Sequence, residues 1–388
     1  MRSRLGSVLA ASAKGGLAAI LRRRPVGRIF DRCVLHIGTE KTGTSAIQYF
    51  LASNRKAFAR DGVLYPRATG ASGGSQWGFV AQAHPRAWAT DVGPFLGFNT
   101  EEGQKAYRDG FVAALTSEFR RAGNASTLVV SSEHMQSRLN DPTMIAALRE
   151  FLDPWVREFR VVLYLRRQDR VSSSLYSTQV KSGAVQPVLF PKFAPSNIIY
   201  YYNYEKLYDN WCSVFGTDAV DVGLFSPGEW RGGTLISDFC SRTGLDLTDK
   251  RMPEAKINTS LDLAGTQFLL EVNRQLPNLV ARERNRERDE LAGLVAKFCV
   301  GNHVPATREQ AQEFYRKFVE MNERLRRKVF PDRAAPLFDD DFSEYPETLD
   351  GNERRYEDAV ALAIRLWRAG KGDDADRNDP RSSASSGR

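Results

Sequence analysis

The chain is poor in cysteine and histidine, with four residues of each among 388. The cysteines are Cys33, Cys212, Cys240 and Cys299, which lie far apart and form no C-x-x-C pair. In a chain of this length such spacing argues against a zinc site and against a disulfide framework. We therefore expect reduced thiols and a cytoplasmic protein, either free or associated with a membrane surface.

Long hydrophobic runs are also missing. The apolar residues near the N-terminus are interrupted by Lys14-Gly15-Gly16, so this stretch is too short to span a bilayer and lacks the core of a secretory signal. Residues 1–32 contain eight basic residues and one acidic residue, and they carry most of the formal net charge of +8. The rest is nearly neutral, which argues against a nucleic-acid partner. The basic segment is expected to be either a flexible extension or a peripheral contact with an anionic membrane.

What the chain does have is a strand followed by a glycine loop, in the residues HIGTEKTGTS from His36 to Ser45. Gly38 and Gly43 have the glycine spacing of a Walker loop, G-x-x-x-x-G-K-[ST], but the lysine position holds Thr44. The lysine occurs earlier, at Lys41. The amphipathic run that follows predicts a helix whose first N–H groups would bind a phosphate. The sequence therefore predicts a phosphate ligand with Lys41 beside the group being transferred.

A second segment has a similar order of features. Residues 159–165 are rich in β-branched and aromatic side chains and predict a strand, which ends at Arg166. A predicted helix follows and contains Ser174. On its own, a basic cluster at a strand end is as often a solvated surface as a binding site.

Taken together, the two segments resemble the sulfotransferases that use 3′-phosphoadenosine 5′-phosphosulfate, in particular their bacterial carbohydrate-type branch. The resemblance spans roughly residues 33–275. It implies an α/β, P-loop-like, three-layer sandwich with a central parallel sheet flanked by helices, a C-terminal helical extension, and no metal. In that family the first loop grips the 5′-phosphate, so the resemblance assigns this role to Thr42, Gly43, Thr44 and Ser45. The lysine contacts the oxygen that joins phosphate to sulfate, a role that falls to Lys41.

The resemblance also assigns the 3′-phosphate of the donor to Arg166 and Ser174. Arg167 or Ser173 would take these roles if the register slipped by one residue. This alternative stays open because Asp169 lies three residues after Arg166, whereas the family more often has its aspartate four residues after the arginine.

A general base is required because the acceptor hydroxyl loses a proton as it attacks sulfur. The predicted strand at 127–132 is followed by Glu133 and His134, and ligands gather at the carboxyl ends of parallel strands. Glu133 is the first candidate and His134 the second, unless Glu133 is simply a polar residue that opens a loop. The remaining histidines are expected to be loop residues (His84 and His303) or a core imidazole (His36).

Strands and helices are expected to alternate along residues 33–243, which predicts a parallel sheet with helices on both faces. An insertion at 67–100 is expected to cover the acceptor site. Its aromatic rings either offer flat faces to sugars or, as is commoner for aromatic residues in loops, pin the insertion to the core. The expected strands are 33–38, 62–65, 127–132, 160–166 and 219–224; the expected helices are 43–54, 101–122, 142–151, 169–182, 204–215 and 232–243; the aromatic candidates are Trp77, Trp88 and Phe95.

Four regions are expected: a basic extension at 1–32, the α/β domain at 33–275, a helical part at 276–369 and a disordered tail at 370–388. After residue 253 we expect helices at 261–274, 285–300 and 307–328 and no further strand. Asn258 and Ser260 either cap the first of these helices or form a loop near the nucleotide.

The sequence thus favours a sulfotransferase acting on a hydroxyl of a carbohydrate or glycolipid. One alternative is a P-loop kinase or hydrolase, which would need a lysine at position 44 and an acidic Mg²⁺ ligand directly ending the third strand. Another is a non-catalytic protein of the same fold at a membrane surface.

Overall fold

The computed structural model describes residues 29–68, 74–253, 261–280, 283–301 and 305–349, together with residues 359, 362 and 363. Its centre is a five-stranded sheet with the order β2-β3-β1-β4-β5, in which every neighbouring pair is parallel. The strands are β1 (Phe30–Gly38), β2 (Val63–Leu64), β3 (Thr127–Ser131), β4 (Val156–Leu165) and β5 (Val220–Leu224).

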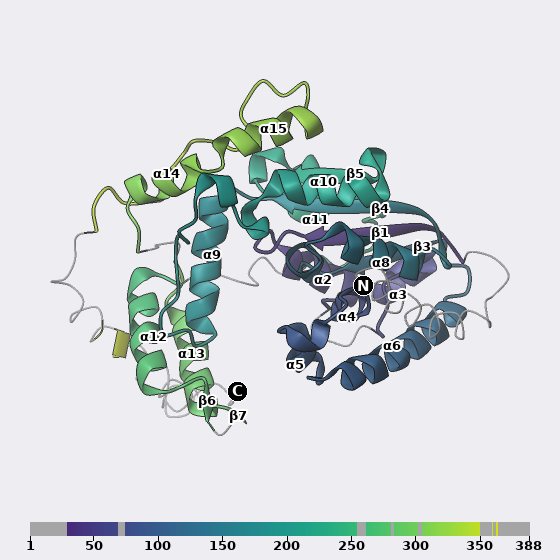
Figure 1. Cartoon of the computed structure of the whole chain (residues 1–388), viewed down its shortest axis with the longest axis horizontal. Helices are drawn as coiled ribbons and strands as arrows, with labels where there is room; N and C mark the ends of the chain where they lie inside the picture. Colours follow the sequence, from purple (N-terminus) through teal and green to yellow (C-terminus); the bar gives the residue numbers. More distant parts are fainter. Residues whose placement is uncertain are drawn as a thin grey trace, which may run out of the picture.

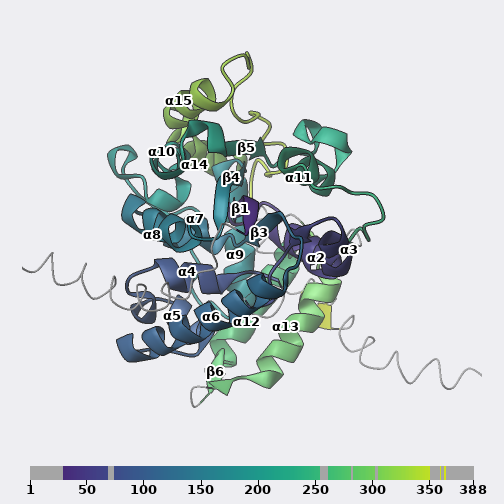
Figure 2. The same cartoon turned by 90° about the vertical axis from the view of Figure 1, so that its right-hand side faces the viewer.

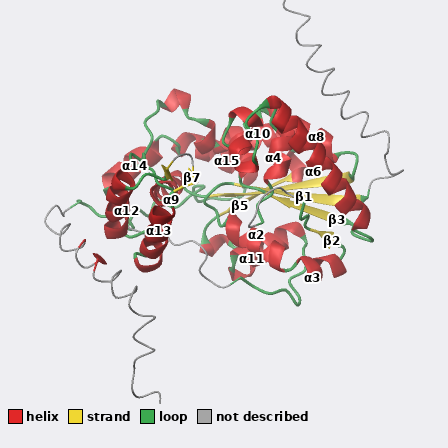
Figure 3. Ribbon diagram, turned by 90° about the horizontal axis from the view of Figure 1, so that it is seen from below, coloured by secondary structure: helices red, strands yellow, loops and turns green. Residues whose placement is uncertain are grey.

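Helices cover both faces of the sheet, because successive apolar residues of each strand point to opposite sides. Leu35, Val130 and Leu163 face one layer of helices, whereas the residue before each of them faces the other layer. Figure 3 shows these layers on the two sides of the sheet. The first layer contains α4 (Trp77–Ala83), α6 (Glu101–Arg121), α8 (Pro142–Leu152) and α10 (Tyr204–Phe215), and the second contains α2 (Thr44–Ser53), α3 (Arg55–Arg60) and α11 (Leu235–Thr243). The predicted α/β three-layer architecture is confirmed.

The C-terminal helices gather around α9 (Gln168–Lys181), which leads away from the sheet (Figure 1). Its apolar side chains Tyr176 and Val180 pack with Leu269, while Val171 packs with Phe314 and Phe318. Figure 2 shows the first two of these C-terminal helices below the sheet layers. The helices of this part are α12 (Leu263–Gln275), α13 (Arg286–Phe298), α14 (Arg308–Arg316) and α15 (Val319–Val329).

Several local expectations were wrong. The single helix predicted over 307–328 is broken between α14 and α15, because Phe318 is fully buried against the base of α9. A short hairpin, β6 (Leu279–Val280) with β7 (Glu283–Arg284), occurs where no strand was expected. The insertion at 67–100, for which no element was predicted, contains α4 and α5 (Val92–Leu96), and its covering of the acceptor site stays a prediction.

The basic extension up to residue 28, the segment with Asn258 and Ser260, His303 and the C-terminal tail lie outside the described residues, and expectations about them stay predictions. The division into four regions likewise stays a prediction. Within the described ranges, no helix is both long and apolar enough to cross a bilayer.

The topology brings three strand ends together. β1 lies between β3 and β4, with His36 opposite Ser131 and Gly38 opposite Leu163. The segments that follow these strands therefore leave the sheet side by side at its carboxyl edge. They carry Lys41, Glu133 and Arg166.

Candidate active site

The loop from Gly38 to the start of α2 is shaped to present backbone N–H groups. Gly43, at the N-cap of α2, has φ 74°, and a Cβ on it would meet Leu235 Cδ2 at 2.4 Å. Only glycine fits this position. Since the first N–H groups of a helix have no partner within it, the N–H groups of Thr44 and Ser45 at the start of α2 are available to an anion.

Side chains of the loop are partly committed to holding its shape. The hydroxyl of Thr42 is buried and donates to the Thr39 carbonyl at 2.6 Å. Thr44 is also buried, and Ser45 is half-buried at the beginning of α2. What Thr42 and Gly43 can offer a ligand is therefore their backbone rather than their side chains.

Lys41 lies in the middle of the loop with φ 66°, a left-handed conformation that costs a non-glycine residue energy and is concentrated at functional sites. Its Nζ donates to Thr178 Oγ1 of α9 at 2.7 Å. Burial lowers the pKa of Lys41; Lys181 and Arg166 act in the same direction, whereas Glu40 and Glu133 raise it. The ammonium therefore sits among other cations in a partly desolvated site.

Arg166 follows β4 and reaches the same loop. Its Nη1 donates to the Lys41 carbonyl at 3.1 Å, and its guanidinium lies over the Phe225 ring at 5.4 Å. The Arg166 carbonyl accepts from the Tyr204 hydroxyl at 2.7 Å, which fixes the strand end. Burial lowers the pKa of Arg166, with a smaller opposing contribution from Glu344.

Neither cation has a carboxylate partner in the part of the chain that the structure describes. The ion pairs found there include twenty-six contacts within 4.0 Å, and none of them involves Lys41 or Arg166. A buried charge without a partner costs several kcal/mol. An anionic ligand bound beside Lys41 and Arg166 would supply the negative charge that these two side chains lack.

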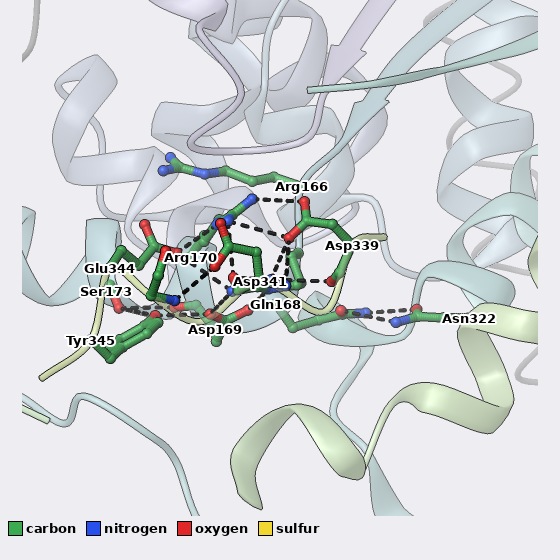
Figure 4. Close-up of polar contacts among 12 residues, drawn as sticks. Arg166, Gln168, Asp169, Arg170, Ser173, Asn322, Asp339, Asp341, Glu344 and Tyr345 are labelled. Atoms are coloured by element: carbon green, nitrogen blue, oxygen red, sulfur yellow. Dashed lines mark hydrogen bonds and ion pairs between the residues drawn. The ribbon is translucent and has the colours of Figure 1, made fainter. Parts of the chain in front are cut away.

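The neighbouring arginine is used differently, in the polar network of Asp169, Asp339 and Tyr345 that Figure 4 shows. Arg167 is 1% exposed, and its Nε and Nη2 donate to the two carboxylate oxygens of Asp169 at 2.7 and 3.0 Å. Its third nitrogen, Nη1, is 2.7 Å from Asp339 Oδ1. The C-terminal segment that carries Asp339 continues to Tyr345, whose hydroxyl contacts Asp169 at 2.8 Å and Ser173 at 3.1 Å. Arg167 and Ser173 thus anchor this segment, which favours Arg166 and Ser174 over the alternative register.

Ser174 is half-buried on α9, one turn before Thr178. Residues four apart lie on the same face of a helix, so Ser174 is on the face that reaches the loop. Its carbonyl accepts from Thr178 Oγ1 at 3.0 Å, and the same oxygen of Thr178 receives the Lys41 hydrogen bond. Lys181 is one turn further along the face.

Glu133 lies just before the short helix α7 (His134–Arg138). Its Oε2 accepts from Gln48 Nε2 of α2 at 2.6 Å, and its backbone is close enough to Gly38 that a Cβ there would meet Glu133 Cα at 3.0 Å. The carboxylate of Glu133 therefore lies beside the loop from Gly38 to the start of α2. It raises the pKa of Lys41, which places the two groups within electrostatic reach.

His134 packs behind Glu133 rather than projecting freely. Its ring stacks on Trp77 at 3.5 Å, its Nε2 is 3.7 Å from Glu133 Oε1, and its Nδ1 is 3.8 Å from Glu40 Oε1. Trp77 is 7% exposed and also stacks on Phe95 at 4.4 Å, so of the two expectations for this ring the structure has the one in which it pins the insertion to the core. Phe95 is 56% exposed.

The two other histidines that the structure describes, His36 and His84, lie away from this cluster. His36 is buried in β1 with Nδ1 2.8 Å from Ser131 Oγ, and burial lowers its pKa to about 3. His84 accepts from the Arg86 N–H at 3.2 Å in the insertion. Among the described residues no group of three or more His, Cys, Asp or Glu side chains could hold a metal ion.

Sequence reasoning did not identify several side chains that line the site. Gln48 lies four residues after Thr44, one turn further along α2, so the sequence places both residues on the same face of the helix. Glu40 directly precedes Lys41, but no sequence motif identified it as a residue of the site. Thr178 and Tyr201 come from segments far apart in the chain and had no sequence signal.

Comparisons with known proteins are sparse. No family model matches the chain. A protein of Archaeoglobus fulgidus described only as uncharacterized is 29% identical over 210 residues, which are 52% of this chain and 54% of that protein. The chain thus spans about half the length of this relative.

A crystal structure of a sulfotransferase from Alicyclobacillus acidocaldarius covers 77% of this chain and 96% of its own, with 14% sequence identity and a TM-score of 0.40. A likeness this distant carries no argument about activity.

Proposed function

We propose that the protein is a sulfotransferase that moves a sulfuryl group from 3′-phosphoadenosine 5′-phosphosulfate to a hydroxyl. The observation that carries the proposal is the pair of half-buried cations, Lys41 and Arg166, which converge on one loop and have no ion pair among the described residues. A donor with phosphates at both ends of its nucleoside would supply the missing charges. Its 5′-phosphate is assigned to the N–H groups at the start of α2, and its 3′-phosphate to Arg166 and Ser174.

In the reaction, the acceptor oxygen forms a bond to sulfur while the bond between sulfur and the bridging phosphate oxygen breaks. Negative charge develops on that bridging oxygen, and a preorganised cation stabilises it. Lys41 has this role in the proposal. Glu133, held by Gln48, removes the hydroxyl proton, and 3′-phosphoadenosine 5′-phosphate leaves. His134 is the alternative base.

The acceptor is proposed to be a carbohydrate or a glycolipid. This rests on Phe95, an exposed ring stacked on Trp77, which in turn stacks on the histidine beside Glu133. An exposed aromatic face linked to the base in this way suits the flat apolar side of a sugar ring. Thr44 in the lysine position of a Walker loop argues against a kinase.

Thermal unfolding with nucleotides tests the proposal. We expect 3′-phosphoadenosine 5′-phosphate to raise the melting temperature without Mg²⁺, because ligand binding to the folded state stabilises it. ATP with Mg²⁺ is expected to do little. The opposite ranking would favour a kinase or hydrolase, and no shift with either nucleotide would favour a non-catalytic role.

A further inference from the structure

Glu40 is the most heavily contacted side chain of the phosphate loop. It stands directly before Lys41, yet its carboxylate turns toward α7 and the loop at residue 201. Oε1 accepts from Ser137 Oγ at 2.6 Å and pairs with Arg138, and Oε2 accepts from the Tyr201 hydroxyl at 3.2 Å. The side chain is 14% exposed.

The carboxylate is ionised under all ordinary conditions. Burial raises the pKa of Glu40, but the His134 ring 3.8 Å away and the charge of Arg138 outweigh this effect, and the resulting pKa is about 2. A fixed negative charge in a loop that binds a polyanion would repel the donor. Arg138 stands where it cancels that charge.

We propose that Glu40 is a positioning residue that joins the donor loop to the helix carrying the base. The inference rests on the proposed function. Gln48 ties Glu133, at the start of α7, to the helix after the loop, and Glu40 ties Ser137 and Arg138, at the end of α7, to the loop itself. These two links set the position of the carboxylate of Glu133 relative to the ammonium of Lys41. In-line transfer depends on such alignment, and a displacement of about 1 Å can cost a factor of about 100 in rate.

The first test is Glu40→Gln with Asp91→Asn as the matched control. Asp91 accepts from the same guanidinium of Arg138 at 2.6 Å, but it is 60% exposed and lies outside the loop. We expect Glu40→Gln to lower kcat by at least about tenfold while the Kd for 3′-phosphoadenosine 5′-phosphate stays within about threefold or tightens, since alignment is lost but a repelling charge is removed. Asp91→Asn should change kcat by less than about twofold, as expected for a surface pair.

A purely structural role of Glu40 would weaken nucleotide binding and turnover together, which contradicts the inference. Equal loss of kcat in Asp91→Asn, or kcat within about twofold of the wild type in Glu40→Gln, also overturns it. Failure of the unmodified chain to bind 3′-phosphoadenosine 5′-phosphate overturns the proposed function as well, so the two failures are distinguishable.

A second test addresses the charge of the loop. Arg138→Gln leaves the carboxylate of Glu40 uncompensated beside the donor, so the Kd for 3′-phosphoadenosine 5′-phosphate should weaken by about tenfold. The double variant with Arg138→Gln and Glu40→Gln lacks that charge, so it should regain most of the affinity for 3′-phosphoadenosine 5′-phosphate. The effects of the two substitutions would then not be additive, which shows that the two positions are coupled. A double variant no tighter than Arg138→Gln alone would contradict the compensation.

Discussion

Substitution of Arg166 by methionine is predicted to separate ligand binding from stability. Methionine keeps an apolar stem against Phe225 but removes the guanidinium, which is half-buried and has no carboxylate partner among the described residues. Because burial lowers the pKa of Arg166, the ligand-free fold bears a cost for holding this charge. Removing the charge should therefore lower the free energy of unfolding of the ligand-free protein by no more than about 1 kcal/mol, which is the contribution of the hydrogen bond to the Lys41 carbonyl.

The nucleotide should respond in the opposite way. A hydrogen bond to a charged phosphate contributes about 1.5–3 kcal/mol, so the Kd for 3′-phosphoadenosine 5′-phosphate should rise by roughly 10- to 150-fold. Isothermal titration calorimetry measures this change, and thermal unfolding of the free variant measures the stability. Arg170→Gln is the matched control, since Arg170 is nearby but pairs with Asp339 and Glu344. The reasoning is refuted if Arg166→Met binds the nucleotide as tightly as the wild type, or if Arg170→Gln loses as much affinity.

Four further predictions concern the chemistry and the binding of the acceptor. Lys41→Ala should reduce kcat by at least about 100-fold, in line with the loss of one transition-state donor, and a normal kcat would remove Lys41 from the mechanism. Because burial lowers the pKa of Lys41, its charge is lost at lower pH than that of an ordinary lysine, near 10.4. The wild-type rate should accordingly decline as pH rises toward that value, and a flat alkaline profile would argue against a charged lysine in the rate-limiting step. Glu133→Gln should lower kcat at least about 100-fold with little change in nucleotide Kd, whereas full activity would move the base to His134. Phe95→Ala should raise the acceptor KM by about tenfold, the loss of one aromatic contact, and leave nucleotide affinity unchanged; an unaltered KM would place the acceptor elsewhere.

The central sheet was predictable because its strands are buried on both faces and carry continuous apolar runs. The apolar runs of β1 and β4 predict both strands. The loop between β1 and α2 has a glycine spacing that few other structures require. The α/β layers therefore followed from local patterns that agree with the global fold.

Other features depend on contacts between distant segments and had no local signal. Arg166 and Arg167 are neighbours with equal charge, and only the arrival of Asp339 and Tyr345 from the C-terminal segment shows which one is committed to structure. The break before α15 arises because Phe318 finds a buried site beside α9. The role of Glu40 likewise depends on Arg138 and Tyr201, which only the fold brings to it.

Transfer itself is the most direct test of the account. Purified protein would be incubated with 3′-phosphoadenosine 5′-phosphosulfate carrying a sulfur isotope label and a mixture of carbohydrates and glycolipids, without Mg²⁺, and the products would be analysed by mass spectrometry. The account predicts acceptors that gain the labelled sulfuryl group with the wild type and do not gain it with Lys41→Ala. Labelled products formed equally by both proteins, or hydrolysis of ATP in place of any transfer, would contradict it.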